Sequence, residues 1–515
     1  MPAETSELDA SSDCHQKVGD GGHLAVHVKN LADRITRMEC TRPEIQRSTR
    51  AANVLWCLGQ ILRQGPTRKC LYNLSEVAEV LDEFWSHSWR ERAWRKVLAL
   101  LVLKNGPAAA VIGTLAAIAA AVFKGSGFLP GYTKPSIDHI GEHHYYEFSL
   151  WALGSGVIAA AVTLVFWQSQ TAVFLDKVCI NQVDDDMKAE GILSIGGFLR
   201  SSKSLLVLWD PTYVRRLWCI FEYAAFVKSH EGQDPAVVKI RPTFLGPCTL
   251  WIFFGSVVVM TTELTIHTFL DKLALFAFTG LGVVGFYFGT AAFRNYYDNV
   301  RQLQVELADF KLSQTKCLCC DMGHEEEGIL CDRQVVMECV HRWFGSVENF
   351  DKVVSTDVSA GLTSQLGQYS FPYRWLLGAT TPILWAQMDM VAARFKAGDN
   401  HGGVVASILA LAMWLVAFPS IFVCWVCLAS MLRKGKWMIL DMLQTLTATV
   451  ITVALAAGMH FYQLLCNHLL HEDHLSGVLL FAGTFLVAAL LAWHPCAMCR
   501  WARGVGKGEQ PAVAS

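Results

Sequence analysis

The residues best suited to chemistry are acidic and hydroxyl side chains that follow short apolar runs. Glu222 lies about one to two turns into a predicted helix that begins near Arg216, while Ser86 and Asp176 follow two predicted strands. Ligands of parallel sheets bind beyond the carboxyl ends of the strands, so these three side chains are expected to line one cleft. The helix N-terminus favours an ionised Glu222, which suits stabilisation of a cation-like transition state or nucleophilic help better than general acid catalysis. Trp218, one turn before Glu222, is expected to pack beside the site.

A second candidate site is a cluster of soft metal ligands in a polar stretch between two apolar regions. Its members are Cys317, Cys319, Cys320, His324 and Cys331. Four such ligands could close a tetrahedral zinc site. The spacing matches no paired Cys-x2-Cys pattern, and cysteines close to a membrane are also candidates for palmitoylation. Zinc binding, acylation and unmodified thiols therefore remain as alternatives for this cluster.

The elements that must position the first site follow one another as strands and helices. Buried-strand patterns occur at 81–85, 171–175 and 204–209, and a shorter one at 237–240, with helical segments between them. This order predicts an α/β domain with a parallel sheet. Two apolar segments within 107–168 interrupt the domain, and an even number of spans returns the chain to the same side of the membrane.

Three motifs of this split domain resemble those of TIR (Toll/interleukin-1 receptor type) domains. Ser86-His87-Ser88-Trp89 is similar to the end of their first strand, and Phe174-Leu175-Asp176-Lys177 to their second strand and the loop after it. Trp218-Cys219-x-x-Glu222 is similar to a motif on the helix after their third strand. The run at 176–182 also resembles fungal heterokaryon-incompatibility domains. Trp89-Arg90 replaces an acidic residue that commonly follows the first strand, and the fifth strand and last helix are not recognisable.

The resemblance implies a TIR/flavodoxin-like sheet and two kinds of function. In family members that cleave NAD, the matching glutamate is catalytic, which makes Glu222 the candidate catalytic residue, NAD the candidate substrate, and Ser86, Asp176 and Trp218 the candidate binding residues. Many TIR domains instead act purely by assembly. Structural roles are the alternatives for each residue: a cap or a pair with Arg215 or Arg216 for Glu222, a loop cap for Asp176, and core packing for Trp218.

The remainder of the chain indicates a membrane protein. It is 53% hydrophobic and 17% charged, with a mean hydropathy of +0.32, which is too apolar for an ordinary soluble protein. Spans are expected at 107–123, 148–168, 244–262, 273–293, 373–391, 404–432, 438–460 and 475–493. The span at 373–391 is the weakest, because Arg374 and Asp389 limit it and Pro382 interrupts it. The distribution of basic residues favours eight spans with both termini in the cytosol.

The sequence thus predicts a multi-span α-helical membrane protein with an inserted cytosolic α/β domain. The regions expected are 1–75 (cytosolic), 76–106 with 169–243 (the split domain), 107–168 and 244–293 (hairpins), 294–372 (cytosolic, with the cysteines), 373–493 (four spans) and 494–515 (tail). Expected partners are the lipid bilayer and further copies of the chain, bound through the α/β domain and through spans such as the one with Gly285-x3-Gly289. The net charge of −2 gives no reason to expect nucleic-acid binding. We expect signalling by assembly, with NAD hydrolysis as its enzymatic form and a channel or transporter as the alternative.

Overall fold

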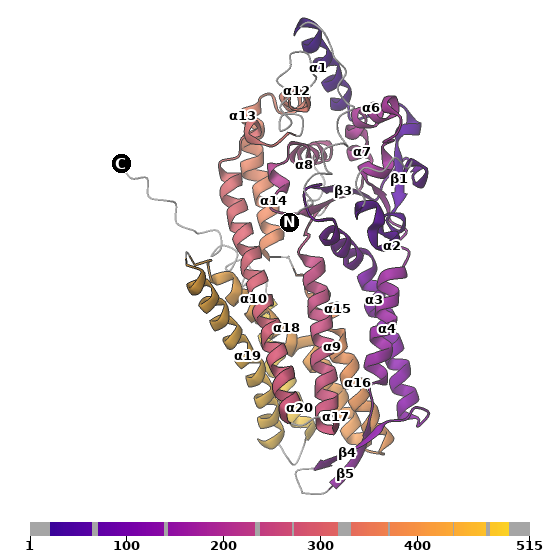
Figure 1. The fold of residues 1–515 in the computed structure, drawn as a ribbon, viewed down its shortest axis with the longest axis vertical. Helices are drawn as coiled ribbons and strands as arrows, with labels where there is room; N and C mark the ends of the chain where they lie inside the picture. The colour runs from indigo at the N-terminus through magenta and orange to yellow at the C-terminus, as the bar shows by residue number, and fades with distance from the viewer. Residues whose placement is uncertain are drawn as a thin grey trace, which may run out of the picture. The chain divides into compact units, whose positions relative to one another are not determined.

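The computed structural model of the chain describes residues 21–63, 71–137, 143–231, 237–269, 272–317, 331–368, 371–435, 437–469 and 474–493. The fold divides into two compact units (Figure 1). The first, called the α/β unit, comprises Met1–Lys104, Gln168–Gly246 and Gln302–Leu366. The second, called the helical unit, comprises Asn105–Trp167, Pro247–Arg301 and Gly367–Ser515. The predicted coarse architecture, an α/β domain together with apolar helices, is confirmed.

The α/β unit is built on a six-stranded sheet in the order β2-β1-β6-β3-β7-β8. The four mutually parallel strands are those predicted: β3 (Glu83–His87), β6 (Ala172–Phe174), β7 (Leu205–Trp209) and β8 (Val238–Pro242). The chain places β6 on one side of β3 and then β7 on the other. The strand order therefore reverses at β3, which is the arrangement that places ligands at the carboxyl ends of the central strands in doubly wound sheets.

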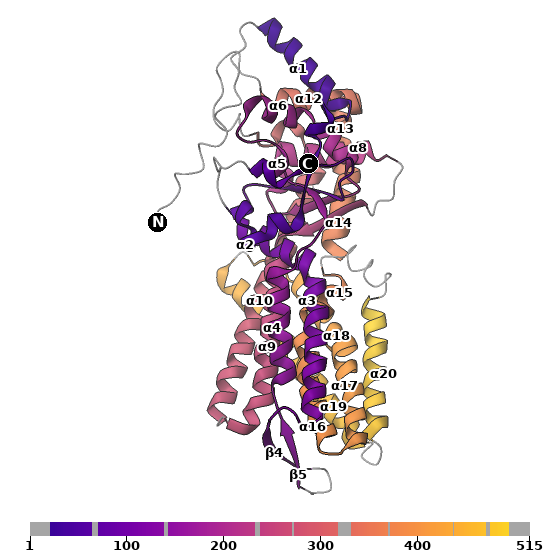
Figure 2. The same ribbon diagram turned by 90° about the vertical axis from the view of Figure 1, so that its right-hand side faces the viewer.

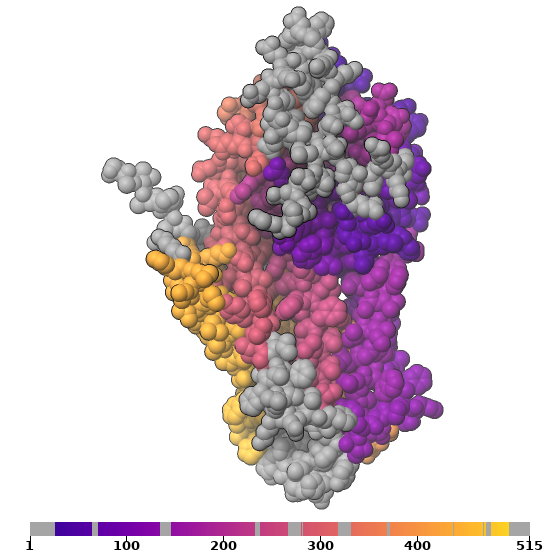
Figure 3. All heavy atoms as spheres, viewed as in Figure 1, coloured from indigo at the N-terminus to yellow at the C-terminus, as the bar shows by residue number. Residues whose placement is uncertain are grey.

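Two further strands were not anticipated. β1 (Arg47–Arg50) pairs antiparallel with β6, and β2 (Glu76–Val77) pairs antiparallel with β1. β1 lies in the stretch 1–75, which the sequence assigned to a separate region, and β2 directly follows that stretch. Residues of β1 and of α2 (Ala51–Arg63), in indigo, form part of the outer surface of the α/β unit (Figure 3).

The helices of the α/β unit come from segments far apart in the sequence. They are α1 (Gly21–Thr36), α2, the beginning of α3 (Ala93–Gly125), α5 (Asp176–Cys179), α6 (Asp185–Leu193), α7 (Ile195–Ser201), α8 (Leu217–Ser229), α12 (Asp332–Phe344), α13 (Val347–Val353) and α14 (Ser359–Gln368). α12 packs against α1 through an ion pair of 2.8 Å between Arg342 and Asp33, and against α8 through stacked rings of Trp343 and Phe221. The predicted region 294–372 is therefore mostly part of the α/β unit.

The edge strand β8 is closed by a side chain in place of a fifth strand. The Gln365 amide on α14 accepts a hydrogen bond from Ile240 N (2.8 Å) and donates one to Val238 O (2.8 Å). These are the backbone groups that a neighbouring strand would otherwise pair. No fifth strand is recognisable in the sequence, and in the structure the Gln365 side chain pairs with the edge of β8 where such a strand would lie.

The helical unit holds most of the apolar sequence. Within the part of the chain that the structure describes, five helices are long and apolar enough to cross a membrane: Ala93–Gly125, Leu245–Thr265, Asn400–Met431, Met438–Cys466 and Leu475–Trp493. They correspond to five predicted spans and lie in α3, α9 (Leu245–Phe269), α17 (Asn400–Ala412) with α18 (Phe418–Met431), α19 (Met438–Leu469) and α20 (His474–Trp493). The predicted span 148–168 forms α4 (Trp151–Phe166), which is apolar but shorter, and 273–293 lies in α10 (Lys272–Ala308). An antiparallel hairpin of β4 (Tyr132–Ile137) and β5 (His143–Phe148) connects α3 to α4 (Figure 2).

The weakest predicted span, 373–391, is not one helix. It forms α15 (Tyr373–Ala379) and α16 (Thr381–Lys396), separated at Thr380. Trp385 of α16 is fully buried against Gly113 and Gly156, where there is no room for a Cβ. Asp389 of α16 is also fully buried and accepts hydrogen bonds from the N-terminal turn of α4. The low hydropathy of this segment thus reflects burial inside protein.

Two further features of the helical unit tie its helices together. The guanidinium group of Arg294, on α10, is buried and donates to the carbonyls of Arg433 and Asp441 at the α18–α19 connection, and it pairs with the Asp441 carboxylate at 2.9 Å. Gly289 on the same helix faces the Trp425 ring, where an added Cβ would come within 2.8 Å. The close approach that the Gly285-x3-Gly289 pair allows is therefore used within the chain.

Candidate functional site

The structure brings Ser86 and Glu222 into direct contact at the carboxyl edge of the sheet. Ser86 is the fourth residue of β3, and Glu222 is the sixth residue of α8. The Ser86 hydroxyl donates to Glu222 Oε2 at 2.6 Å and lies 2.7 Å from the Tyr213 hydroxyl. Tyr213 is fully buried and donates to the Cys219 carbonyl at 3.1 Å. Three polar side chains from β3, the loop after β7 and α8 thus form one continuous chain of contacts.

The direction of the hydrogen bonds among Glu222, Ser86 and Tyr213 depends on the charge of Glu222. When the carboxyl is protonated, each group can donate to the next, from Glu222 through Ser86 and Tyr213 to the Cys219 carbonyl. When the carboxyl is ionised, Ser86 must donate to Glu222 and Tyr213 must donate to Ser86, which leaves the Cys219 carbonyl without that partner. Because Ser86 is the donor in its contact with Glu222, this contact favours the ionised carboxyl.

Burial favours the neutral form of Glu222. Desolvation raises the pKa of Glu222 to about 8, the Ser86 hydrogen bond opposes this rise, and the charge of Asp176 adds to it. The direction of this shift is opposite to the one expected from the helix N-terminus, because desolvation outweighs the dipole at this position.

Asp176 belongs to the same end of the sheet and is linked to the loop after β3. Its Oδ2 atom accepts a hydrogen bond of 2.9 Å from the Trp89 indole, and its Oδ1 atom accepts one of 2.7 Å from Lys177 N. Burial raises the pKa of Asp176. Trp89, one of the two residues at which the chain departs from the TIR pattern, therefore holds together the loops that follow β3 and β6. The second of these bonds lies within the first turn of α5, of which Asp176 is the first residue.

Trp218 is turned toward another element. Its indole N–H donates to Asp332 at the start of α12 at 2.9 Å, and its ring packs edge-to-face against Phe221. The basic neighbour considered for Glu222, Arg215, pairs instead with Glu306. These contacts assign Trp218 to the packing between α8 and α12, whereas its predicted role in binding has no contact with Ser86 or Glu222 to support it among the residues described.

Two buried polar groups beside the site have an atom without a hydrogen-bond partner among the described residues. They are Nε2 of His87, at the end of β3, and Oδ2 of Asp210, directly after β7. Burial lowers the pKa of His87 well below its usual value and raises the pKa of Asp210, so both groups are driven toward their neutral forms. An unpaired buried polar atom is costly and is frequent at sites that take a ligand or water.

Sequence reasoning did not single out His87, Asp210 or Tyr213. The signal was nonetheless present, because each lies within four residues of the end of a predicted strand, where site residues of parallel sheets gather. The neighbouring thiol of Cys219 is buried, and desolvation raises its pKa well above the usual value. Cys219 is therefore a residue of the buried core.

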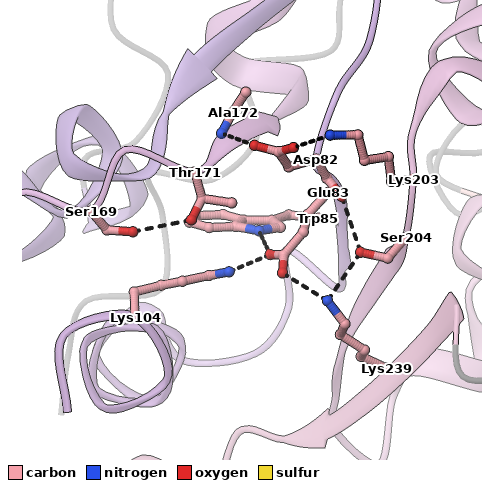
Figure 4. Close-up of polar contacts among 10 residues, drawn as sticks. All are labelled: Asp82, Glu83, Trp85, Lys104, Ser169, Thr171, Ala172, Lys203, Ser204 and Lys239. Atoms are coloured by element: carbon pink, nitrogen blue, oxygen red, sulfur yellow. Dashed lines mark hydrogen bonds and ion pairs between the residues drawn. The ribbon is translucent and has the colours of Figure 1, made fainter. Parts of the chain in front are cut away.

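A second charged cluster lies at the opposite, amino end of β3 (Figure 4). The Glu83 carboxylate is paired with Lys104 of α3 and, at 3.3 Å, with Lys239 of β8, and it accepts a hydrogen bond of 2.9 Å from the Trp85 indole. Burial acts to raise the pKa of Glu83, but the charge and hydrogen bond of Lys104 outweigh it, so the pKa is lowered. This cluster connects β3, β8 and α3, and its fully satisfied ion pairs identify it as structural.

The predicted zinc site falls mostly outside the described residues. Cys317 and Cys331 are both buried at the ends of the described segments, whereas Cys319, Cys320 and His324 lie outside them. Within the residues that the structure describes, no group of three or more histidine, cysteine or acidic side chains could hold a metal ion. Zinc binding by this cluster stays a prediction.

The geometry of the site is therefore that of a half-buried carboxyl with a raised pKa beside hydroxyl groups at the reversal point of a parallel sheet. Such a carboxyl can donate a proton, or it can become a localised negative charge when a cation arrives. No family model, no curated protein and no solved structure matches this chain.

Proposed function

We propose that the chain is a membrane-anchored signalling protein that acts through assembly of its TIR-like α/β unit and cleaves NAD at Glu222. The observation that carries the proposal is the 2.6 Å contact between Ser86 and Glu222 at the carboxyl edge of β3, where the strand order reverses. The reversal point is where a dinucleotide binds in sheets of this topology. The unpaired atoms of His87 and Asp210 beside it add donors and acceptors for such a ligand.

The reaction requires a negative charge near the ribose. The bond between the ribose carbon and the nicotinamide nitrogen breaks, its electron pair goes to the ring nitrogen, and water adds to the carbon and releases a proton. The departing ring carries a positive charge before cleavage, and the ribosyl carbon gains one during cleavage. A carboxylate stabilises both, as in glycosidases. Because a nearby cation favours the ionised form of a carboxyl, binding of the nicotinamide ring would lower the raised pKa of Glu222 and ionise it in place.

Nicotinamide release by the full-length protein in lipid nanodiscs tests the catalytic part. We expect Glu222→Gln, which retains the shape and the contact with Ser86, to reduce kcat by a factor of about 100 or more, the loss typical for removal of one charge-stabilising group. Glu231→Gln provides a matched control, because Glu231 is an exposed carboxylate just beyond the end of the same helix. Equal turnover by the two variants would remove Glu222 from the mechanism.

The assembly part has a separate test on the loop that follows β6. Val183 in this loop is 56% exposed and precedes three acidic residues at the start of α6. We expect Val183→Asp to abolish the formation of clusters, measured by cross-linking of the full-length protein in membranes. Glu222→Gln should leave clusters intact. Clusters that persist in Val183→Asp would place the assembly surface elsewhere.

A further inference from the structure

α2 presents an unusual apolar turn to the outside of the α/β unit. Trp56 is 59% exposed, Leu58 is 46% exposed, and the Cys57 side chain between them is also exposed. Cys57 and Leu58 have φ values of 50° and 56°, in the left-handed region, followed by Gly59 at 66°. The left-handed conformation costs an L-residue about 1–2 kcal/mol, so two adjacent non-glycine residues of this kind need support from their surroundings.

The surroundings supply that support and fix the direction of the turn. The Arg63 guanidinium donates to the Cys57 carbonyl at 2.8 Å, which closes the turn on itself. Gly59 packs so closely on Val97 of α3 that an added Cβ would come within 2.4 Å of a Val97 methyl group. The backbone at 57–59 is thus held against α3, and the Trp56–Leu58 turn is held outward.

Covalent connections place this turn close to the ends of two apolar helices. Ala52 N, in α2, donates to the Ser169 carbonyl at 3.0 Å, and Ser169 is three residues beyond Phe166, the end of α4. Three residues span at most about 10 Å. Val97 precedes Lys104 by seven residues within α3, which corresponds to about 10 Å of helix, and α3 continues as one of the five apolar helices. α2 therefore lies within reach of the headgroup layer of any bilayer that these helices cross.

The charge of the segment fits the same location. Residues 46–63 contain no acidic residue and three basic ones: Arg47, Arg50 and Arg63. A basic segment beside a membrane is attracted to anionic lipids by about 1 kcal/mol per basic residue. Tryptophan and leucine beside basic residues are the side chains that enter the headgroup region of a bilayer.

We infer that the Trp56-Cys57-Leu58 turn inserts into the headgroup region of the bilayer and fixes the α/β unit to a membrane surface rich in anionic lipid. This anchor is independent of the chemistry at Glu222. It adds a contact with lipid to those that the apolar helices provide.

The test uses a fluorescent amino acid with a naphthyl side chain in place of Trp56 in the full-length chain. The protein is reconstituted in nanodiscs of phosphatidylcholine and phosphatidylserine, with a nitroxide quencher on some lipids near the headgroup. We expect the quencher to lower the emission at position 56 by about half or more, as for side chains buried just below the headgroups. The same probe in place of Val183, a residue of similar exposure beyond the carboxyl end of β6, should keep its emission.

Emission at position 56 that is unaffected by the quencher would overturn the inference, and so would equal quenching at positions 56 and 183. A second measurement, with Leu58→Asp, keeps the result independent of the probe. This exposed substitution should leave the unfolding temperature of the protein in detergent unchanged. In nanodiscs it should make Cys57 at least several-fold more reactive toward a water-soluble maleimide, detected at that residue by mass spectrometry. Equal reactivity of Cys57 with and without Leu58→Asp would also overturn the inference.

Discussion

Glu83→Gln is expected to destabilise the α/β unit by about 3–5 kcal/mol, the cost of removing one partner from a buried ion pair. The side chains of Glu83 and Lys104 are only 9% and 11% exposed, so the Lys104 charge would remain buried without its counter-ion. Lys239 is 44% exposed, and solvent screening limits its share of the effect to under about 1 kcal/mol. Glutamine still accepts the hydrogen bond from the Trp85 indole. The loss of stability in Glu83→Gln therefore measures the effect of removing the negative charge of Glu83.

A double-mutant cycle in the full-length protein measures this effect. The free energy of unfolding of the α/β unit is obtained by pulse proteolysis in urea for Glu83→Gln, Lys104→Met and the double variant. Because the double variant contains neither buried charge, it should be less destabilised than the sum of the single variants by about 2 kcal/mol or more. Strictly additive losses would refute the view that the two charges depend on each other.

The effect also has a defined pH dependence. The pKa of Glu83 is lowered in the folded state, so its contribution is fully present above the unfolded pKa of about 4.5 and is lost as the pH falls through the lower, folded value. The difference in stability between wild type and Glu83→Gln should therefore vanish only in acid below that range. A difference that already disappears between neutral pH and pH 5 would contradict the assigned direction.

Three further predictions concern other parts of the chain. Ser86→Ala removes a hydrogen bond that favours ionised Glu222, so the pKa seen in the pH profile of kcat should rise by about 1–2 units; an unchanged profile would contradict the contact. Gln365→Leu leaves backbone groups of β8 unpaired and should cost about 1–3 kcal/mol, with faster amide hydrogen exchange at Ile240; unchanged exchange there would show that water replaces the glutamine. Asp389→Leu leaves the first turn of α4 without its acceptor and should lower the unfolding temperature in detergent, whereas an equal temperature would make this cap dispensable.

The parallel strands could be predicted from the sequence because they are short apolar runs between turn residues. β7, which reads Leu-Leu-Val-Leu-Trp, is fully buried and needs no tertiary information to be recognised. β1, which reads Arg-Ser-Thr-Arg, has no such pattern. It becomes a strand because the edge of β6 offers backbone partners, and that depends on residues more than 100 positions away.

Only part of the candidate site was predictable from the sequence. Ser86 and Glu222 could be placed at one edge of the sheet from motif spacing, whereas His87, Asp210 and Tyr213 were not singled out. The burial of Glu222 depends on the packing around α8, which the motif does not encode, so the dipole argument missed the rise in its pKa. The same limit applies to 373–391, because hydropathy does not distinguish lipid from a protein interior such as that around Trp385.

The glutamine that closes β8 has a consequence for how copies of the chain can join. A polymer that grows by continuing a sheet from one subunit to the next needs a row of available N–H and C=O groups at an edge strand. At β8, the Gln365 amide already occupies two of those groups, and β2 at the other edge is only two residues long. Growth by strand addition is thus blocked on one side and poorly templated on the other. An ordered array that does not extend this six-stranded sheet would be held together by other surfaces, such as helices and loops, and its geometry would be set by side chains that can be altered without disturbing the sheet.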